Sequence, residues 1–192
     1  KYSNFRVIDA NYEFNYSKIN NQAVKEAKGE YIVLLNNDTE IITPHWLQIM
    51  VGYAMQPHIG AVGTKLLYPD NTVQHAGIIL GIGGIAQHCF IDNPRDDVGF
   101  YGRLSVPFNY SAVTAACLMV SKEKYLEVNG LEEDLQVAFN DVDFNLKLLK
   151  QGYYNICLNH VELYHHESKS RGDDTVDTSS AKYRRFVQEH DY

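Results

Sequence analysis

The chain has 192 residues, of which 45% are hydrophobic and 21% are charged, a balance typical of a soluble globular protein. Its 17 Lys and Arg residues against 24 Asp and Glu residues give a formal net charge of −7. Nucleic acid is therefore not expected as a partner, because a phosphate backbone is bound through a basic surface. The sequence contains no run of about 18 apolar residues, so it predicts no transmembrane segment.

The three cysteines are an odd number and are widely spaced: Cys89, Cys117 and Cys157. This pattern favours reduced thiols and a cytoplasmic location over a disulfide framework. The chain opens at Lys1 with a segment, residues 1–8, that has the character of a strand. We therefore expect a fragment of a larger protein.

The first half of the chain alternates helical and strand patterns. Apolar residues recur at helical spacing after Ser17, a candidate N-cap, and Gly29 ends this segment. Residues 31–35 form an uninterrupted apolar run, which is typical of a strand covered on both faces. Thr43 and Pro44 then predict the start of a helix that continues to about residue 55.

The second half continues this alternation. It predicts strands over 59–68, 72–80, 112–120, 153–158 and 161–164, helices over 141–151 and 181–190, and a long loop over 81–109. The fold class is therefore α/β, with a mixed, mainly parallel sheet flanked by helices. We expect the C-terminal portion of a larger α/β domain over 1–170 and a polar loop with a C-terminal helix over 171–192.

Polar residues follow the first predicted strand directly. In an open α/β sheet, ligands bind beyond the carboxyl ends of the strands. Asn36, Asn37 and Asp38 lie at such an end. A carboxylate with flanking amides can reach a divalent cation on a diphosphate, although Asn and Asp are also ordinary turn residues.

Two further polar groups lie later in the chain. Asp141 and Asp143 open a predicted helix, where one carboxylate could serve as a general base while the other stabilises the helix start. His165 and His166 end the last predicted strand. Only one of these histidines would enter a given site, because consecutive strand residues point to opposite faces. A neutral imidazole is a suitable ligand for Mn²⁺, but two surface histidines would give the same sequence.

The order of these segments resembles the family 2 glycosyltransferases, especially the bacterial rhamnosyltransferase-like branch. The matching segments cover nearly the whole chain: Asn20-Asn21-Gln22-Ala23, Lys28-Gly29-Glu30-Tyr31, Leu34-Leu35-Asn36-Asn37-Asp38-Thr39-Glu40, Gly63-Thr64-Lys65, Tyr68-Pro69-Asp70, Gln74-His75-Ala76-Gly77, Val113-Thr114-Ala115-Ala116, Asn129-Gly130-Leu131, Asn140-Asp141-Val142-Asp143 and His165-His166-Glu167-Ser168.

This resemblance implies a GT-A fold and transfer of a hexosyl or deoxyhexosyl group from a nucleotide-diphosphate sugar, usually with inversion. It assigns Asp38 and His165 to a divalent metal, Mg²⁺ or Mn²⁺, with His166 as the second choice. Asp141 matches the base that activates the acceptor. Asn36, Asn37, Asp38 and Asn20 would bind the donor.

The acceptor implied by the resemblance is a glycan or glycolipid, in cell-surface polysaccharide synthesis. Candidate residues on the acceptor side are His75, Thr114, Asn140, Asp143 and Trp46, although core packing also suits Trp46. The parent protein could associate peripherally with the inner face of the membrane.

The match departs from the family at two places. Asn140 stands where the family commonly has Glu, and the family's first two strands, which hold the nucleotide, have no counterpart. We therefore expect an exposed sheet edge and an inactive or impaired fragment. A nucleotidyltransferase is one alternative, but the Gly-rich basic loop of such enzymes is not visible. The alternative from another class is a non-catalytic module that binds glycan or nucleotide.

Overall fold

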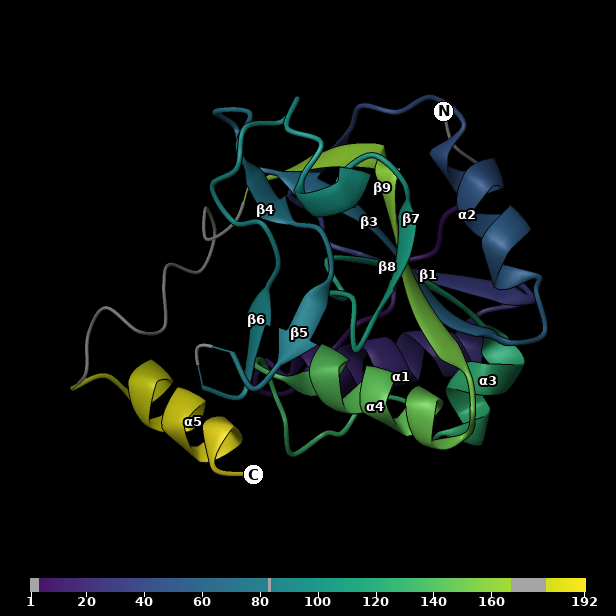
Figure 1. Cartoon of the computed structure of the whole chain (residues 1–192). Helices are drawn as coiled ribbons and strands as arrows, with labels where there is room; N and C mark the ends of the chain where they lie inside the picture. The colour runs from purple at the N-terminus through teal and green to yellow at the C-terminus, as the bar shows by residue number, and fades with distance from the viewer. Residues whose placement is uncertain (1–3, 83, 167–178) are drawn as a thin grey trace.

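The computed structural model describes residues 4–82, 84–166 and 179–192. These residues form a seven-stranded sheet with helices on both faces and a separate two-stranded sheet (Figure 1). In chain order the elements are α1 (Tyr16–Glu26), β1 (Tyr31–Leu35), β2 (Thr39–Ile41), α2 (Trp46–Ala54), β3 (Ile59–Leu67), β4 (Val73–His75), β5 (Ile78–Leu80), β6 (Ala86–His88), η1 (Phe100–Gly102), β7 (Pro107–Tyr110), β8 (Cys117–Ser121), α3 (Lys122–Glu127), α4 (Asn140–Lys150), β9 (Tyr154–His165) and α5 (Ala181–His190).

The main sheet has the strand order β1-β8-β3-β9-β2, with β4 paired to β3 and β7 paired to β9. This mixed sheet flanked by helices confirms the predicted fold class. Among the described strands β3 and β9 run parallel and the other pairings of the sheet are antiparallel, a larger antiparallel share than the sequence indicated. A continuous apolar run shows that both faces of a strand are covered, but it does not fix the direction of its neighbours.

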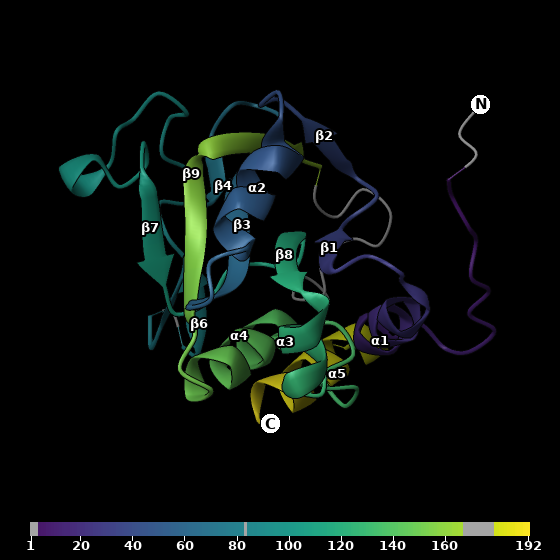
Figure 2. The ribbon, with the colours of Figure 1, turned by 90° about the vertical axis from the view of Figure 1, so that its right-hand side faces the viewer.

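Two hydrophobic cores cover opposite faces of the sheet. On β8, Leu118 and Val120 pack into the core shared with α1 and α4, whereas Cys117 and Met119 pack into the core shared with α2. This alternation follows the two-residue period of a strand. Figure 2 shows α1, α3 and α4 grouped together, apart from α2. All three cysteines are buried and unpaired, as predicted.

Some element boundaries differ from the sequence predictions. α1 begins at Tyr16 because Asn15, rather than Ser17, caps it and accepts a hydrogen bond from the Lys18 N–H. Ser17 is buried and donates to the Leu135 carbonyl at 2.6 Å. The strands predicted over 153–158 and 161–164 are one strand, β9, which bulges where its register against β3 shifts. In the sequence, the polar residues at a β-bulge look the same as polar residues that separate two strands.

The predicted long loop over 81–109 is partly ordered by β6, η1 and β7. A cluster of ion pairs anchors it to the sheet. Lys65 on β3 lies 2.8 Å from one oxygen of Glu162 on β9, and Arg95 in the loop lies 2.7 Å from the other. Only 4% of Lys65 is exposed, so its charge depends on this partner for compensation.

The predicted C-terminal helix is present as α5, and it contacts the chain just before α4. Glu189 is 5% exposed and accepts hydrogen bonds from the backbone N–H groups of Gln136, Val137 and Ala138. Phe186 stacks against Phe139 with ring centroids 5.7 Å apart. The predicted domain boundary at residue 170 lies outside the described residues. None of the helices in the described parts of the chain has the length and apolar character needed to cross a bilayer.

Candidate active site

The first half of the candidate site lies where β1, β2 and β9 meet. Asp38 sits in the turn between β1 and β2, and Thr39 on β2 is paired with His165 at the end of β9. The His166 N–H donates to the Asp38 carbonyl at 2.9 Å. The antiparallel pairing of β2 with β9 brings together residues that are 127 positions apart in the sequence, because Asp38 directly precedes β2 and His165 ends β9.

The side chains of Asp38 and His165 point toward one another. His165 Nε2 lies 3.2 Å from Asp38 Oδ1 and 3.2 Å from the amide nitrogen of Asn36. The His165 side chain is 10% exposed and that of Asp38 is 20% exposed. His166 instead points its Nε2 toward Glu40 at 3.5 Å. His165, rather than His166, therefore lies beside Asp38.

Asp38 Oδ1 is buried, and no described group donates a hydrogen bond to it. Burying a carboxylate oxygen costs free energy unless a hydrogen-bond donor or a cation lies within contact distance of it. A divalent cation meets this requirement, because carboxylate oxygen and imidazole nitrogen are both accepted as ligands by Mn²⁺. The described residues contain no cluster of three or more His, Cys, Asp or Glu side chains that could hold a metal ion. Asp38 and His165 supply two side chains of a kind that a divalent cation accepts.

The second half of the candidate site lies at the start of α4. Asp141 is half-buried in the first turn of this helix. Its Oδ2 accepts a hydrogen bond from the Ala115 N–H at 3.1 Å, and its Oδ1 accepts one from the Val142 N–H at 2.8 Å. Asn145, one turn along α4, donates to the Asp141 and Val113 carbonyls. The carboxylate is therefore held mainly by backbone donors.

Tyr16, the first residue of α1, supports the Asp141 half of the candidate site. Its hydroxyl donates to the Ala115 carbonyl at 2.9 Å, so the peptide groups on both sides of Ala115 are fixed. Burial, followed by the nearby charge of Asp141, raises the pKa of Tyr16 well above its usual range. The tyrosine thus stays protonated as a hydrogen-bond donor. The sequence alone had not indicated this role.

The two halves meet at two consecutive residues. The Ala115 N–H binds Asp141, and the Ala116 carbonyl accepts a hydrogen bond from the Asn36 N–H at 3.0 Å. Segment 113–116 therefore connects Asp141 with the turn after β1 that carries Asn36 and Asp38. Thr114, an acceptor-side candidate, is half-buried in this segment.

Three acceptor-side candidates have placements that argue against direct contact with an acceptor. His75 is fully buried, with 0% of the residue exposed. Trp46 is 9% exposed and belongs to the core under α2. Asn140 is 3% exposed and donates to the Val137 and Leu135 carbonyls, which fixes the turn before α4. Trp46 is held by packing and Asn140 by hydrogen bonds, whereas the buried Nδ1 of His75 has no hydrogen-bond partner among the described residues.

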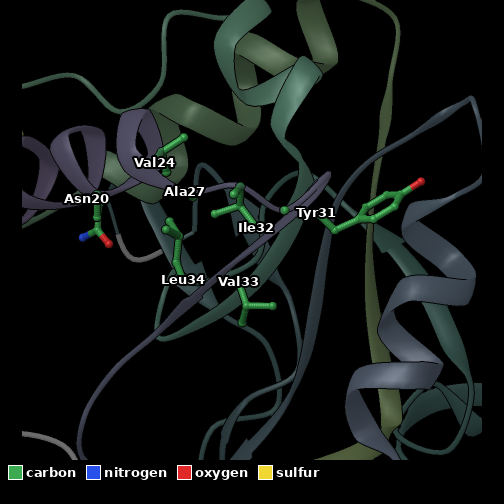
Figure 3. Close-up of a pocket in the computed structure, with 9 residues that line it drawn as sticks. Asn20, Val24, Ala27, Tyr31, Ile32, Val33 and Leu34 are labelled. Carbon is green, nitrogen blue, oxygen red and sulfur yellow. The ribbon is translucent and has the colours of Figure 1, made fainter. Parts of the chain in front are cut away.

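The remaining candidates lie at the surface. Asp143 forms an ion pair with Lys147 at 2.7 Å, one turn along α4. Asn37 is exposed in the turn after β1. Asn20 donates to the Tyr16 carbonyl and borders a groove of about 280 Å³ between α1 and β1, where Figure 3 shows it beside Val24. This groove runs along the edge of β1 that faces away from β8. No described strand pairs with that edge.

Residues 1–120 of the 192 match the family described as Glycosyl transferase family 2. The chain belongs to this family. Its sequence is 46% identical over 183 residues to the uncharacterized protein y4gI of Sinorhizobium fredii, covering 95% of this chain and 20% of that protein. It is 42% identical over 170 residues to the O-antigen biosynthesis protein RfbC of Myxococcus xanthus, covering 85% of this chain and 13% of that protein. The family 2 chain thus spans a fifth or less of these relatives.

Solved structures place the same fold among glycosyltransferases. GalNAc-T7 with UDP, GalNAc and Mn²⁺ superposes with a TM-score of 0.69 at 11% identity, covering 97% of this chain and 37% of that one. The mannosyltransferase PcManGT of Pyrobaculum calidifontis, in complex with GDP-Man and Mn²⁺, gives 0.59 at 18% identity, covering 95% and 43%. The family and the GT-A fold predicted from the sequence are confirmed, and this family 2 chain carries a glycosyltransferase domain.

Proposed function

We propose that the protein to which this family 2 chain belongs transfers a sugar from a nucleotide-diphosphate donor to a hydroxyl group of a glycan or glycolipid, with a divalent metal at Asp38 and His165. The observation that carries the proposal is the close approach of Asp38 Oδ1 and His165 Nε2, 3.2 Å apart, at the end of the sheet. Asp141 supports it from the adjoining segment, because Ala115 and Ala116 connect the two halves.

Each residue has a defined task in this scheme. Asp38 and His165 would hold Mn²⁺ or Mg²⁺, which when bound offsets the negative charge that grows on the departing diphosphate. Asp141 takes the proton of the acceptor hydroxyl as that oxygen bonds to the anomeric carbon. The bond from the anomeric carbon to the diphosphate oxygen breaks at the same time, and the diphosphate leaves with the electron pair. Attack from the opposite face inverts the anomeric configuration.

The relatives support the substrate class. GalNAc-T7 was solved with UDP and Mn²⁺ and PcManGT with GDP-Man and Mn²⁺, so this fold accommodates nucleotide diphosphates with a metal. RfbC is described as an O-antigen biosynthesis protein, which favours a cell-surface polysaccharide as the acceptor. We extend these properties to the present chain as part of the proposal, together with a cytoplasmic site of action.

Calorimetric titration of UDP, dTDP and GDP, each with and without Mn²⁺, tests the metal site. We expect one nucleotide to bind in a metal-dependent manner and Asp38→Ala to abolish that dependence. Glu40→Ala is the matched control, because Glu40 is an exposed carboxylate two residues further along the chain. Equal binding by Asp38→Ala and the unchanged chain would contradict the proposed metal site.

A further inference from the structure

Asn145 joins α4 to the segment that supplies a hydrogen-bond donor to Asp141. It lies on α4, one turn after Asp141, and 0% of the residue is exposed. Its Oδ1 accepts a hydrogen bond from the Val113 N–H at 3.3 Å, and its Nδ2 donates to the Val113 carbonyl at 3.0 Å. Nδ2 also donates to the Asp141 carbonyl at 2.7 Å. One buried side chain therefore contacts both segment 113–116 and the residue proposed as the base.

The chemistry of an amide side chain matches these three contacts. The backbone of Val113 offers one donor and one acceptor, and the Asp141 carbonyl offers a second acceptor. The side chain of Asn145 has one acceptor oxygen and two N–H donors. All three are used, and the donor at Val113 fixes which end of the amide is the oxygen. A carboxylate of the same size has no donor, and a leucine has neither donor nor acceptor.

The backbone at 111–113 is held from other sides as well. The side chain of Val113 is buried against Gly63 on β3, where an added Cβ would lie 2.6 Å from the Val113 Cβ. Asn155 on β9 donates to the Ser111 carbonyl at 3.1 Å and to the Asn145 carbonyl at 3.0 Å. This stretch of backbone is therefore tied to β3, β9 and α4 together.

The contacts close a ring around the proposed base. The Ala115 N–H, two residues after Val113, donates to the Asp141 carboxylate. We propose that Asn145 is a positioning residue that sets the distance between this carboxylate and the Ala115 N–H. The part of the inference that concerns turnover rests on the proposed function, whereas the part that concerns the hydrogen bond does not. Nothing in this role requires Asn145 to touch the donor or the acceptor.

Hydrogen exchange of the side-chain NH₂ group tests the contacts in the unmodified chain. Both protons of Asn145 Nδ2 should exchange at least about 10-fold more slowly than those of Asn109, which is exposed on β7, because both are hydrogen-bonded in the interior. Equal exchange rates for the two side chains would overturn the inference without any substitution.

The backbone amide of Ala115 gives the second readout. In Asn145→Leu this amide should exchange about 10- to 100-fold faster, toward its rate in Asp141→Ala, which lacks the acceptor. Asn145→Ala removes the same contacts without the bulk of leucine, and it should give the same result if Asn145→Leu does not fold. Asn159→Leu is the matched control, because Asn159 is equally buried but donates to the Arg103 carbonyl. Unchanged exchange in the Asn145 variants, or an equal increase in the control, would contradict the inference.

Turnover separates positioning from general stability. In the longer protein to which the chain belongs, Asn145→Ala should lower kcat by about 10- to 100-fold and leave KM for the nucleotide sugar within about threefold. A displaced base slows proton transfer, whereas donor binding does not use it. Asn159→Leu should change kcat by less than about threefold. Equal losses of kcat in the two variants would show that Asn145 acts through stability alone, and the positioning role would be wrong.

The failure of this inference differs from the failure of the proposed function. If Asp141→Asn retains turnover, the proposed base is wrong, but the exchange of the Ala115 amide still decides the role of Asn145. If Asp141→Asn abolishes turnover while Asn145→Ala preserves both kcat and the exchange of Ala115, the base stands and the positioning role of Asn145 is wrong.

Discussion

The proposed metal half of the site (Asp38 and His165) and the proposed base half (Asp141) are built by different kinds of contact. On the metal side, His165 is held by the side chains of Gln74 and Asn36. On the base side, the Asp141 carboxylate is held by backbone N–H groups. A single substitution can therefore delete a contact on the metal side. On the base side the donors cannot be deleted, and only the path of the backbone that carries them can change.

Adjacent residues of β4 serve the two halves. Gln74 points to His165, and His75 points to the opposite side, where its Nε2 accepts from the Gly77 and Thr114 N–H groups at 3.3 and 3.5 Å. Successive side chains on a strand point to opposite faces, and this alternation places Gln74 and His75 on opposite sides of β4. His75 thus supports segment 113–116, on which the base half depends. The contacts of this buried histidine are with backbone N–H groups.

The largest expected effect is on the base itself. Asp141→Asn keeps the size of the side chain but removes its ability to take a proton, so kcat should fall by about 100- to 10,000-fold while nucleotide affinity stays unchanged. Turnover is measured on the longer protein to which the chain belongs, as release of the nucleoside diphosphate in the presence of acceptor. Asp143→Asn, two residues along the same helix and paired with Lys147, is the control and should retain turnover. Full turnover by Asp141→Asn would favour a non-catalytic binding module.

A smaller effect is expected where α5 supports the base half. Glu189 accepts from three successive N–H groups, at residues 136–138, directly before α4. Glu189→Ala leaves these donors without a charged acceptor, and the free energy of unfolding should fall by about 2 kcal/mol. Hydrogen exchange should rise at residues 136–138 and in α5. Exchange that is unchanged there would show that the helix is held by Phe186 and Phe139 alone.

The pH dependence of stability tests the placement of His75. Burial, with a smaller contribution from His88, lowers the pKa of His75 well below its ordinary value of 6.5. Below pH 6.5 the unfolded chain therefore binds a proton that the folded chain does not, and the free energy of unfolding falls as the pH falls. The slope contributed by one such group is about 1.4 kcal/mol per pH unit.

Urea unfolding between pH 7 and pH 5 measures this slope. His75→Gln should flatten it, because the variant has no group to titrate at this position. His58→Gln is the matched control, since His58 is exposed, and its slope should equal that of the unmodified chain. A slope unaffected by His75→Gln would contradict the buried, neutral state of His75.

The sequence predicted the parts of this site that are local. Asp38 and Asp141 could be found because each lies directly after a strand or at the start of a helix. His165 could be found because it ends an apolar run. The contacts that hold them could not, because Gln74 and His165 are 91 positions apart and the Glu189 contacts span 51 to 53 positions. Periodicity shows which face of an element is covered, but not which distant side chain completes a hydrogen bond.

The same limit explains the acceptor-side candidates. His75 and Asn140 are polar residues inside recognisable motifs, and such residues suggest contact with a substrate. Both instead satisfy backbone groups in the interior. Burial of a polar residue is tolerated when its hydrogen bonds are made, and sequence alone does not show whether a partner is available.

The smallest expected effect concerns Tyr16, whose hydroxyl donates to the segment that carries the Asp141 donor. Tyr16→Phe removes the hydrogen bond to the Ala115 carbonyl and leaves the ring in place. The free energy of unfolding should fall by about 1 kcal/mol. Because Ala115 keeps its N–H, the Asp141 contact remains, and kcat should change by less than about threefold. A much larger loss of kcat with a small loss of stability would mean that the position of the Asp141 carboxylate depends on the Tyr16 hydroxyl as well as on the backbone donors.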